Sequence, residues 1–197
     1  MDHCFQRLET LAPAGYTAGV HIRFAAPLYL KSTYPEAWQE LYADNSYALR
    51  DPLVFWGISK VGRTRWSEVA LPDPFGVLRQ AAEHGLPYGA VVSCGKITSR
   101  TIVGVARADR EFTDAEIAEV EAAARDLHAQ AAPPADLAPE EKAALRLVDG
   151  GRSPEVAATV MGMPRGELEG WLAAARDRLG VATTGEALDR ARAFKMI

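Results

Sequence analysis

The chain has 197 residues, of which 48% are hydrophobic and 24% are charged, and its formal net charge is −4. This composition is typical of globular proteins and excludes extensive disorder, while the negative charge excludes a protein that is basic over its whole surface. Cys4 and Cys94 are the two cysteines, too few for a disulfide framework or a cysteine-based zinc cluster.

The N-terminal stretch MDHCFQRLETL is amphipathic and lacks the apolar core of a signal peptide. No stretch of the sequence approaches the ~18 apolar residues that a membrane span requires. We therefore expect a cytoplasmic protein with two reduced thiols and no membrane partner.

Four strands are predicted in the first two thirds of the chain. Residues 17–24 can pair with residues 27–31 across Ala25 and Ala26. Residues 89–94 and 101–108 form a second pair, joined by a polar turn. The first strand alternates in hydropathy, which predicts two faces. One face carries Val20, Ile22 and Phe24, and the other carries His21 and Arg23.

Helices are predicted at residues 34–44, 72–85 and 113–130. The third opens with a capping box formed by Thr113 and Glu116. Strands and helices together predict an α+β fold, an α/β/α sandwich sensor domain with an antiparallel sheet over residues 1–131. The apolar stripe expected on the third helix consists of Ile117, Val120, Ala124 and Leu127.

A short linker is predicted at residues 132–136, because Pro133 and Pro134 cannot continue a helix. Four short helices follow in residues 137–197, with Gly162 in the tight turn between the second and the third. This pattern predicts a small four-helix helix-turn-helix domain. The expected helix starts are Ser153 before Pro154, Pro164, and either Thr183 or Thr184.

Two sets of residues in this chain resemble one known family. The C-terminal skeleton LAPEE…LRLV.GGRS…GMP…L..WL.AARDRLGV is similar to the DNA-binding domain of LuxR-type quorum-sensing regulators. The N-terminal region independently resembles the acyl-homoserine-lactone-binding domain of the same family, in the family's order and near its spacing. The residues that carry this second match are Tyr34, Trp38, Tyr42, Asp51, Pro52, Trp66 and Gly89.

The resemblance implies a binding site for an acyl-homoserine lactone and no cofactor. By this resemblance, Asp51 would accept from the amide N–H of the ligand. Trp38 would donate to the lactone carbonyl, and Tyr34 would donate to the acyl carbonyl. Tyr42 and Trp66 would form an aromatic wall around the ligand.

Two glycines bear on the expected pocket. Gly89 would let the backbone approach the ligand closely. Gly104 stands at a strand position where many family members carry a Ser or Thr hydroxyl that contacts the ligand. The helical layer before the first strand is also shorter than is usual in the family, so this chain departs from the family's pattern in pocket size and in one contact.

The same residues have structural interpretations. Tyr34, Trp38 and Tyr42 recur at four-residue spacing, so they share one helix face, and such a stripe is often core. Asp51 followed by Pro52 is typical of a helix N-cap with proline at the first helical position. That role does not exclude a contact with a ligand.

The third helix of the C-terminal unit is unusual for a helix that reads DNA, because its first turn carries Glu167 and Glu169. Carboxylates repel phosphates, and from Leu137 onward the chain has nine basic and nine acidic residues, hence no net charge. The candidate DNA contacts are Arg152, Ser153, Arg165, Arg176 and Arg178.

Three functional hypotheses stay open. In the first, the chain is a ligand-dependent regulator that binds promoter DNA as a dimer. In the second, it binds DNA poorly and acts as an anti-activator by forming a heterodimer with a related regulator. In the third, it is a GAF- or PAS-like sensor of some other small molecule. The first two predict a dimer, for which helix 113–130 offers alanines that allow close approach.

An enzyme is not expected. The histidines His3, His21, His84 and His128 show no metal-ligand spacing, and the sequence has no glycine-rich phosphate loop and no nucleophile elbow. Cys94 has no histidine near it in sequence and is expected to be an inert core thiol.

Overall fold

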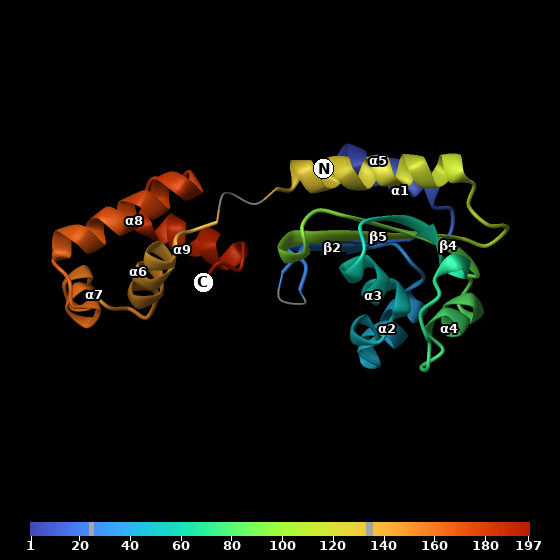
Figure 1. Ribbon diagram of the computed structural model, residues 1–197, viewed down its shortest axis with the longest axis horizontal. Coiled ribbons are helices and arrows are strands. Elements are labelled where there is room, and N and C mark those ends of the chain that lie inside the picture. The colour runs from blue at the N-terminus through green and yellow to red at the C-terminus, as the bar shows by residue number, and fades with distance from the viewer. Residues whose placement is uncertain (24–25, 133–135) are drawn as a thin grey trace. The chain divides into compact units, whose positions relative to one another are not determined.

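The computed structural model describes residues 1–23, 26–132 and 136–197. The chain divides into two compact units, Met1–Ala132 and Pro133–Ile197, and each has its own hydrophobic clusters (Figure 1). Five residues of the predicted hairpin and linker lie outside the described residues: Phe24 and Ala25 of the first hairpin, and Pro133, Pro134 and Ala135 of the linker.

A five-stranded antiparallel sheet forms the centre of the first unit, in the order β2-β1-β5-β4-β3. It confirms the predicted α+β class and both predicted strand pairs. The sequence does not predict β3, because its four residues, GRTR, offer no apolar side chain to alternate. The strands are β1 (Tyr16–Ile22), β2 (Tyr29–Ser32), β3 (Gly62–Arg65), β4 (Tyr88–Cys94) and β5 (Arg100–Arg107).

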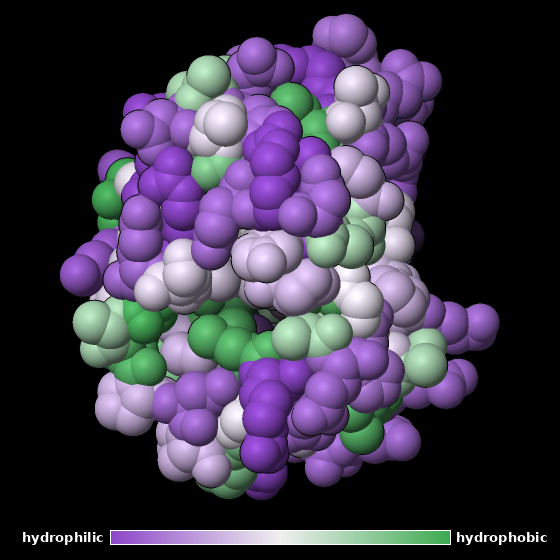
Figure 2. Space-filling view, turned by 90° about the vertical axis from the view of Figure 1, so that its right-hand side faces the viewer, coloured by the Kyte–Doolittle hydropathy of each residue, from purple (hydrophilic) through white to green (hydrophobic). Residues whose placement is uncertain are grey.

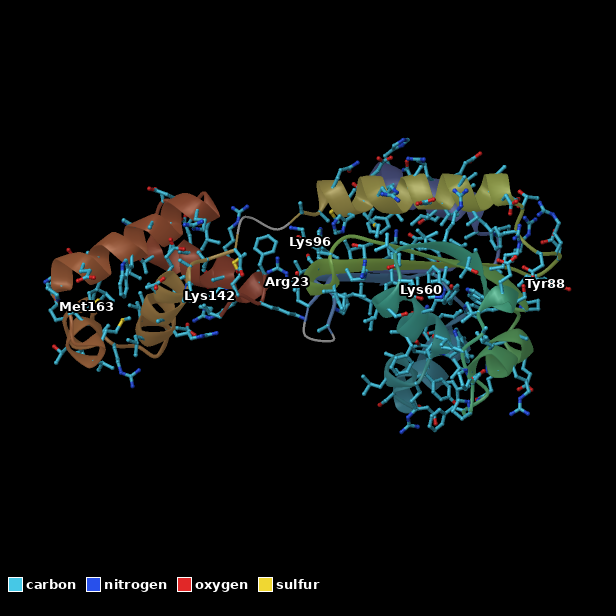
Figure 3. All side chains as sticks on the ribbon, in the orientation of Figure 1. Arg23, Lys60, Tyr88, Lys96, Lys142 and Met163 are labelled. Atoms are coloured by element: carbon cyan, nitrogen blue, oxygen red, sulfur yellow. The ribbon has the colours of Figure 1, made fainter. Side chains whose placement is uncertain are left out.

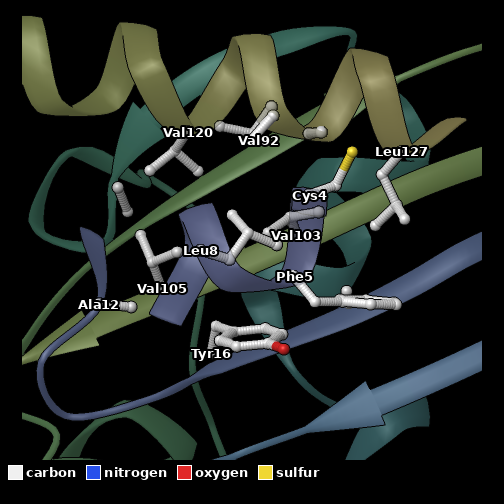
Figure 4. Packing of buried hydrophobic residues seen from close by; sticks show 14 of the residues in the cluster. Cys4, Phe5, Leu8, Ala12, Tyr16, Val92, Val103, Val105, Val120 and Leu127 are labelled. Carbon is white, nitrogen blue, oxygen red and sulfur yellow. The ribbon is translucent and has the colours of Figure 1, made fainter. Parts of the chain in front are cut away.

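Helices α1 (Asp2–Leu11) and α5 (Asp114–Gln130) cover one face of the sheet. As predicted, the Thr113 hydroxyl accepts from the N–H of Glu116, whose carboxylate accepts from the N–H of Thr113 in return. All four residues of the predicted stripe on α5 are buried. Figure 4 shows the resulting core, in which α1 contributes Cys4, Phe5 and Leu8, α5 contributes Val120 and Leu127, and the strands contribute Tyr16, Val92, Val103 and Val105.

Three helices cover the opposite face of the sheet (Figure 1). Figure 2 shows this unit from the right of Figure 1, with a largely hydrophilic surface over the α1 and α5 layer. Hydrophobic residues gather lower on that face, at the level of the other helical layer. The elements of this layer are α2 (Glu36–Asp44), α3 (Pro52–Ser59) and α4 (Val77–Glu83), with 3₁₀ turns at Tyr47–Leu49 and Trp66–Glu68, and a further 3₁₀ turn precedes β5 at Ile97–Ser99.

Two of these helices begin later than the sequence predicts. The residue before α2 is Pro35, whose backbone is extended, so Tyr34 precedes the helix instead of lying on it. The start of α4 is set by Asp73, because its carboxylate accepts from the backbone N–H groups of Val77 and Leu78, both over 2.9 Å.

The first strand does not alternate as predicted. Its pairing with β5 shifts between Gly19 and Ile22, and His21 adopts a φ of 50°. Val20 is buried with α1 and α5, whereas Ile22 packs into the cluster on the opposite face. The prediction that Val20 and Ile22 share a face is therefore wrong. The bulge turns the ring of His21 toward α5, where it contacts His128.

Residues 136–197 form four helices around a core of leucines and alanines. Ser153 caps the second of them as predicted, since its hydroxyl accepts from the N–H of Val156, and Thr183 caps the fourth. The turn after the second helix uses Gly162 at a φ of 68°, and Met163, labelled in Figure 3, follows it and donates its N–H to the carbonyl of Ala158. The helices are α6 (Pro139–Asp149), α7 (Pro154–Met161), α8 (Arg165–Leu179) and α9 (Thr184–Ala193).

Within the described ranges, no helix combines the length and the apolar character that crossing a bilayer would need.

Candidate functional site

A cavity of about 550 Å³ lies in the first unit, on the side of the sheet that α2, α3 and α4 cover. This volume is in the range of pockets that hold small molecules. The walls are mostly apolar, with a few polar atoms. Five of the seven residues predicted to contact a ligand line it together, namely Tyr34, Trp38, Tyr42, Asp51 and Trp66.

The carboxylate of Asp51 is held by two different donors. Oδ1 accepts from the backbone N–H of Leu53 over 2.7 Å, which makes Asp51 the N-cap of α3 with Pro52 at the first helical position, as the sequence predicts. Oδ2 accepts from the hydroxyl of Tyr42 over 2.8 Å. Burial raises the pKa of Asp51, while the hydrogen bonds from Leu53 and Tyr42 oppose that rise. The cavity therefore contains a fixed acceptor with lone pairs to spare.

The hydroxyl of Tyr34 is buried and has no hydrogen-bond partner among the described residues. Burial, assisted by the charge of Asp51, raises the pKa of Tyr34, so the phenol stays neutral and able to donate. A Cβ built on Gly104 would lie 3.1 Å from this hydroxyl oxygen. The hydroxyl thus lies over bare strand backbone at Gly104.

Three aromatic rings pack on one another beside the cavity; Trp38 and Tyr42 line it, and Tyr47 does not. The ring of Trp38 lies 5.6 Å from that of Tyr42 at an angle of 68°, and the ring of Tyr42 lies 5.8 Å from that of Tyr47 at 84°. Such edge-to-face pairs stabilise a rigid wall. The sequence reasoning missed Tyr47, whose hydroxyl donates to Oε1 of Gln80 over 3.0 Å and so ties this wall to α4.

Gly89 and Pro52 do not line the cavity. A Cβ on Gly89 would lie only 2.2 Å from Cε2 of Trp66, so this glycine lets the indole pack against the backbone of β4. The predicted close approach to the backbone at Gly89 is thus made by the indole of Trp66, which belongs to the wall of the cavity. Pro52 is buried as the first residue of α3.

Residues 14–132 match the family model described as the autoinducer binding domain. The chain belongs to the autoinducer-binding domain family. This match confirms the resemblance inferred for the N-terminal region. No curated protein sequence matches the chain.

Solved structures agree with this domain in fold. SdiA in complex with octanoyl-rac-glycerol superposes with a TM-score of 0.54 at 17% identity, covering 98% of this chain and 88% of that one. Escherichia coli SdiA in another crystal gives a TM-score of 0.52 at 17% identity, with coverages of 100% and 89%. CepR2 from Burkholderia cenocepacia, described as an N-acylhomoserine lactone dependent LuxR family transcription factor, gives 0.50 at 18% identity, with coverages of 66% and 93%.

Further residues of this domain line the cavity, although the sequence did not predict them as ligand contacts. Thr17 and Gly19 of β1, together with Leu30 of β2, belong to the floor, and Leu49 and Phe55 belong to the helical side. These residues come from separate strands and turns, so no local periodicity connects them. Their common role depends on the strand order.

Two of the residues predicted to contact DNA form ion pairs within the second unit. Arg165 forms ion pairs with Glu155 and Glu169, and Nε of Arg178 lies 3.0 Å from Oε2 of the buried Glu141. The other three candidate DNA contacts form no ion pair with each other and lie at different places in this unit. Ser153 caps α7, Arg176 donates to the hydroxyl of Thr184, and Arg152 is exposed.

The other reactive side chains lie outside the cavity. Burial raises the pKa of the Cys94 thiol, which keeps it protonated. In the described part of the chain, no three His, Cys, Asp or Glu side chains gather closely enough to hold a metal ion.

Proposed function

We propose that this autoinducer-binding domain binds an acyl-homoserine lactone or a similar amphiphilic signal. The single observation that carries the proposal is the pairing, in one apolar cavity, of a buried carboxylate with an unpartnered buried hydroxyl. A ligand with both an N–H and a carbonyl satisfies both groups, because a carboxylate only accepts and a neutral phenol donates. Leaving either group unsatisfied in a dry site costs free energy.

The proposed contacts are those that the family resemblance implies, and the donors and acceptors of the cavity fit them. Asp51 accepts from the amide N–H, Tyr34 donates to the acyl carbonyl, and Trp38 donates to the lactone carbonyl. Tyr42 keeps the carboxylate in place through its own hydrogen bond. The apolar remainder of the cavity takes the acyl tail.

Expression of the full chain with and without candidate lactones, followed by mass spectrometry of the bound fraction, tests this proposal. Recovery of a lactone at one molecule per chain supports it. Recovery of an unrelated molecule from both cultures would replace it with the sensor of another small molecule, the third hypothesis above.

We further propose that α6 to α9 form a helix-turn-helix domain and that the chain controls transcription as a dimer. The support is the sequence similarity of this unit to LuxR-type DNA-binding domains, together with its four helices, of which α7 and α9 begin at side-chain caps. In this proposal α8 is the helix that enters the major groove. The protein is then a cytoplasmic regulator without enzymatic activity.

A second candidate is an anti-activator that pairs with a related regulator and prevents that regulator from binding DNA. Two observations favour it. Glu167, in the first turn of α8, and Glu169, just after that turn, are exposed. Arg165 and Arg178 are already paired with carboxylates. Few cations are left to neutralise phosphates, which supply most non-specific affinity.

A gel-shift titration at low salt, with ligand present, separates the two candidates. Tight binding that weakens steeply with salt supports the DNA-binding regulator and eliminates the anti-activator. Absence of binding, together with loss of DNA binding by a related regulator when the two are mixed, establishes the anti-activator.

A further inference from the structure

We propose that the cavity takes a signal with a long apolar tail, and that this tail leaves the cavity beside Leu30, at the edge of the sheet. The inference rests on the proposed function and adds the class of signal. It has three supports: the floor of the cavity, its polar end and its exposed end.

The floor lacks side chains along one diagonal of the sheet. Gly104 of β5 lies opposite Thr17 of β1, and Gly19, two residues further along β1, lies opposite Leu30 of β2. Residues two apart on a strand share a face, and all four of these residues line the cavity. The two glycines therefore leave a low path from Gly104 toward Leu30, which the side chain of Ile22 borders at Gly19.

The polar end of this path lies at Gly104. The unpartnered hydroxyl of Tyr34 stands 3.1 Å from where a Cβ of Gly104 would be, and the charge of Asp51 acts on that hydroxyl. A ligand head that hydrogen-bonds to Tyr34 and Asp51 therefore starts its tail over Gly104. From there the open path over Gly19 leads toward β2.

The other end of the path is exposed. Leu30, Leu49 and Phe55 line the cavity, yet they are 70%, 66% and 52% exposed. Because β2 is an edge strand, the floor ends at Leu30. Exposed apolar residues that gather at the rim of a cavity mark a place where an apolar ligand makes contact. The rim is thus an apolar surface on which the part of the tail that extends beyond the cavity can pack.

This geometry predicts how affinity depends on tail length. Each methylene that leaves water strengthens binding about fourfold, since it contributes about 0.8 kcal/mol. In an enclosed pocket this gain ends in a clash once the tail is too long, and affinity falls again. With an open rim, affinity instead rises and then levels off.

The test is a titration of the purified full chain with acyl-homoserine lactones from butanoyl to hexadecanoyl, read by isothermal calorimetry. We expect dissociation constants that fall with each methylene and then stay level through hexadecanoyl. A best length followed by a loss of tenfold or more for longer tails would overturn the open rim while leaving lactone binding intact. If no member of the series binds, the proposed function falls as well.

Two variants test whether the acyl tail follows this path. Leu30→Gln removes the apolar rim, and Gly19→Ala adds a Cβ that would lie 3.3 Å from Cδ1 of Ile22 and narrows the floor. Both are expected to weaken the binding of hexadecanoyl-homoserine lactone several-fold more than the binding of the hexanoyl compound. Ile97→Gln is the matched control, because Ile97 is 69% exposed and lies in the turn before β5, away from the path. Equal effects of Leu30→Gln and Ile97→Gln would contradict the proposal.

Discussion

The hydroxyl of Tyr42 donates to Oδ2 of Asp51 over 2.8 Å, while the other carboxylate oxygen caps α3. One side chain thus fixes the start of a helix and presents an acceptor to the cavity. The two roles use different oxygens, so a single substitution can separate them.

Asp51→Asn is expected to weaken lactone binding about tenfold to a hundredfold, since a hydrogen bond to a charged group is worth about 1.5–3 kcal/mol. Asparagine is as good an N-cap as aspartate, so the melting temperature is expected to change little. Calorimetric titration and thermal unfolding measure the two effects. Asp126→Asn is the matched control, because it makes the same exchange at an exposed position of α5 that does not line the cavity. Unchanged affinity in Asp51→Asn would remove this residue from the site.

Gly89→Ala is expected to destabilise the first unit by about 1–3 kcal/mol, because the new methyl group would overlap the indole of Trp66. In a background of Trp66→Ala the same change is expected to cost much less, since the overlapping ring is gone. Urea unfolding of the four variants gives this coupling. Gly166→Ala, at an exposed helical position with open space around it, is the control and is expected to stabilise slightly. If the effects of the two substitutions on the free energy of unfolding are additive, the overlap between the new methyl group and the Trp66 ring is relieved by movement elsewhere.

Local sequence signals predicted both ends of α5 to within one residue. Thr113 and Glu116 form their capping box within four residues of chain, so the sequence contains the whole interaction. The pair formed by Asp51 and Pro52 predicted the start of α3 in the same way. Signals of this kind need no knowledge of the sheet.

The floor of the cavity could not be predicted in that way. Gly19 and Gly104 become neighbours only when β1 pairs with β5, and the bulge at His21 depends on a backbone angle that hydropathy does not encode. The spacing of Tyr34 predicts that it lies on a helix face, although α2 begins only at Glu36, after Pro35. Tyr34 reaches the cavity from the loop, so the predicted residue is present for a different structural reason.

Protonation of a histidine pair, of which His21 is buried and His128 half-buried, is expected to make the fold less stable in acid. The rings of His21 and His128 lie 4.1 Å apart, and Nε2 of His21 lies 2.8 Å from the carbonyl of His128. Burial lowers the pKa of both. For His21 the hydrogen bond to the His128 carbonyl opposes this effect, and the charges of His128 and Arg23 add to it, so that the pKa stays lowered. The unfolded chain therefore binds more protons below its ordinary histidine pKa of 6.5, so the free energy of unfolding falls as the pH drops through that value.

Urea unfolding between about pH 8 and about pH 5 measures this dependence. His128→Gln and His21→Asn remove the titrating groups and are expected to flatten the slope in that window, and asparagine tolerates the positive φ at position 21. The wild-type slope surviving in the double variant would assign the acid sensitivity to other groups.

Reversing the charge of the leading turn of α8 is expected to create or strengthen DNA binding. Glu167 is exposed and lies in the first turn, so Glu167→Lys replaces a repulsive charge with one that can neutralise a phosphate. Each new phosphate contact steepens the dependence of log affinity on log salt by about 0.9. Gel shifts at several salt concentrations, with Glu119→Lys on α5 as a control of equal charge change, measure that slope. An equal gain in both variants would indicate a general charge effect and would leave α8 without a special role in DNA contact.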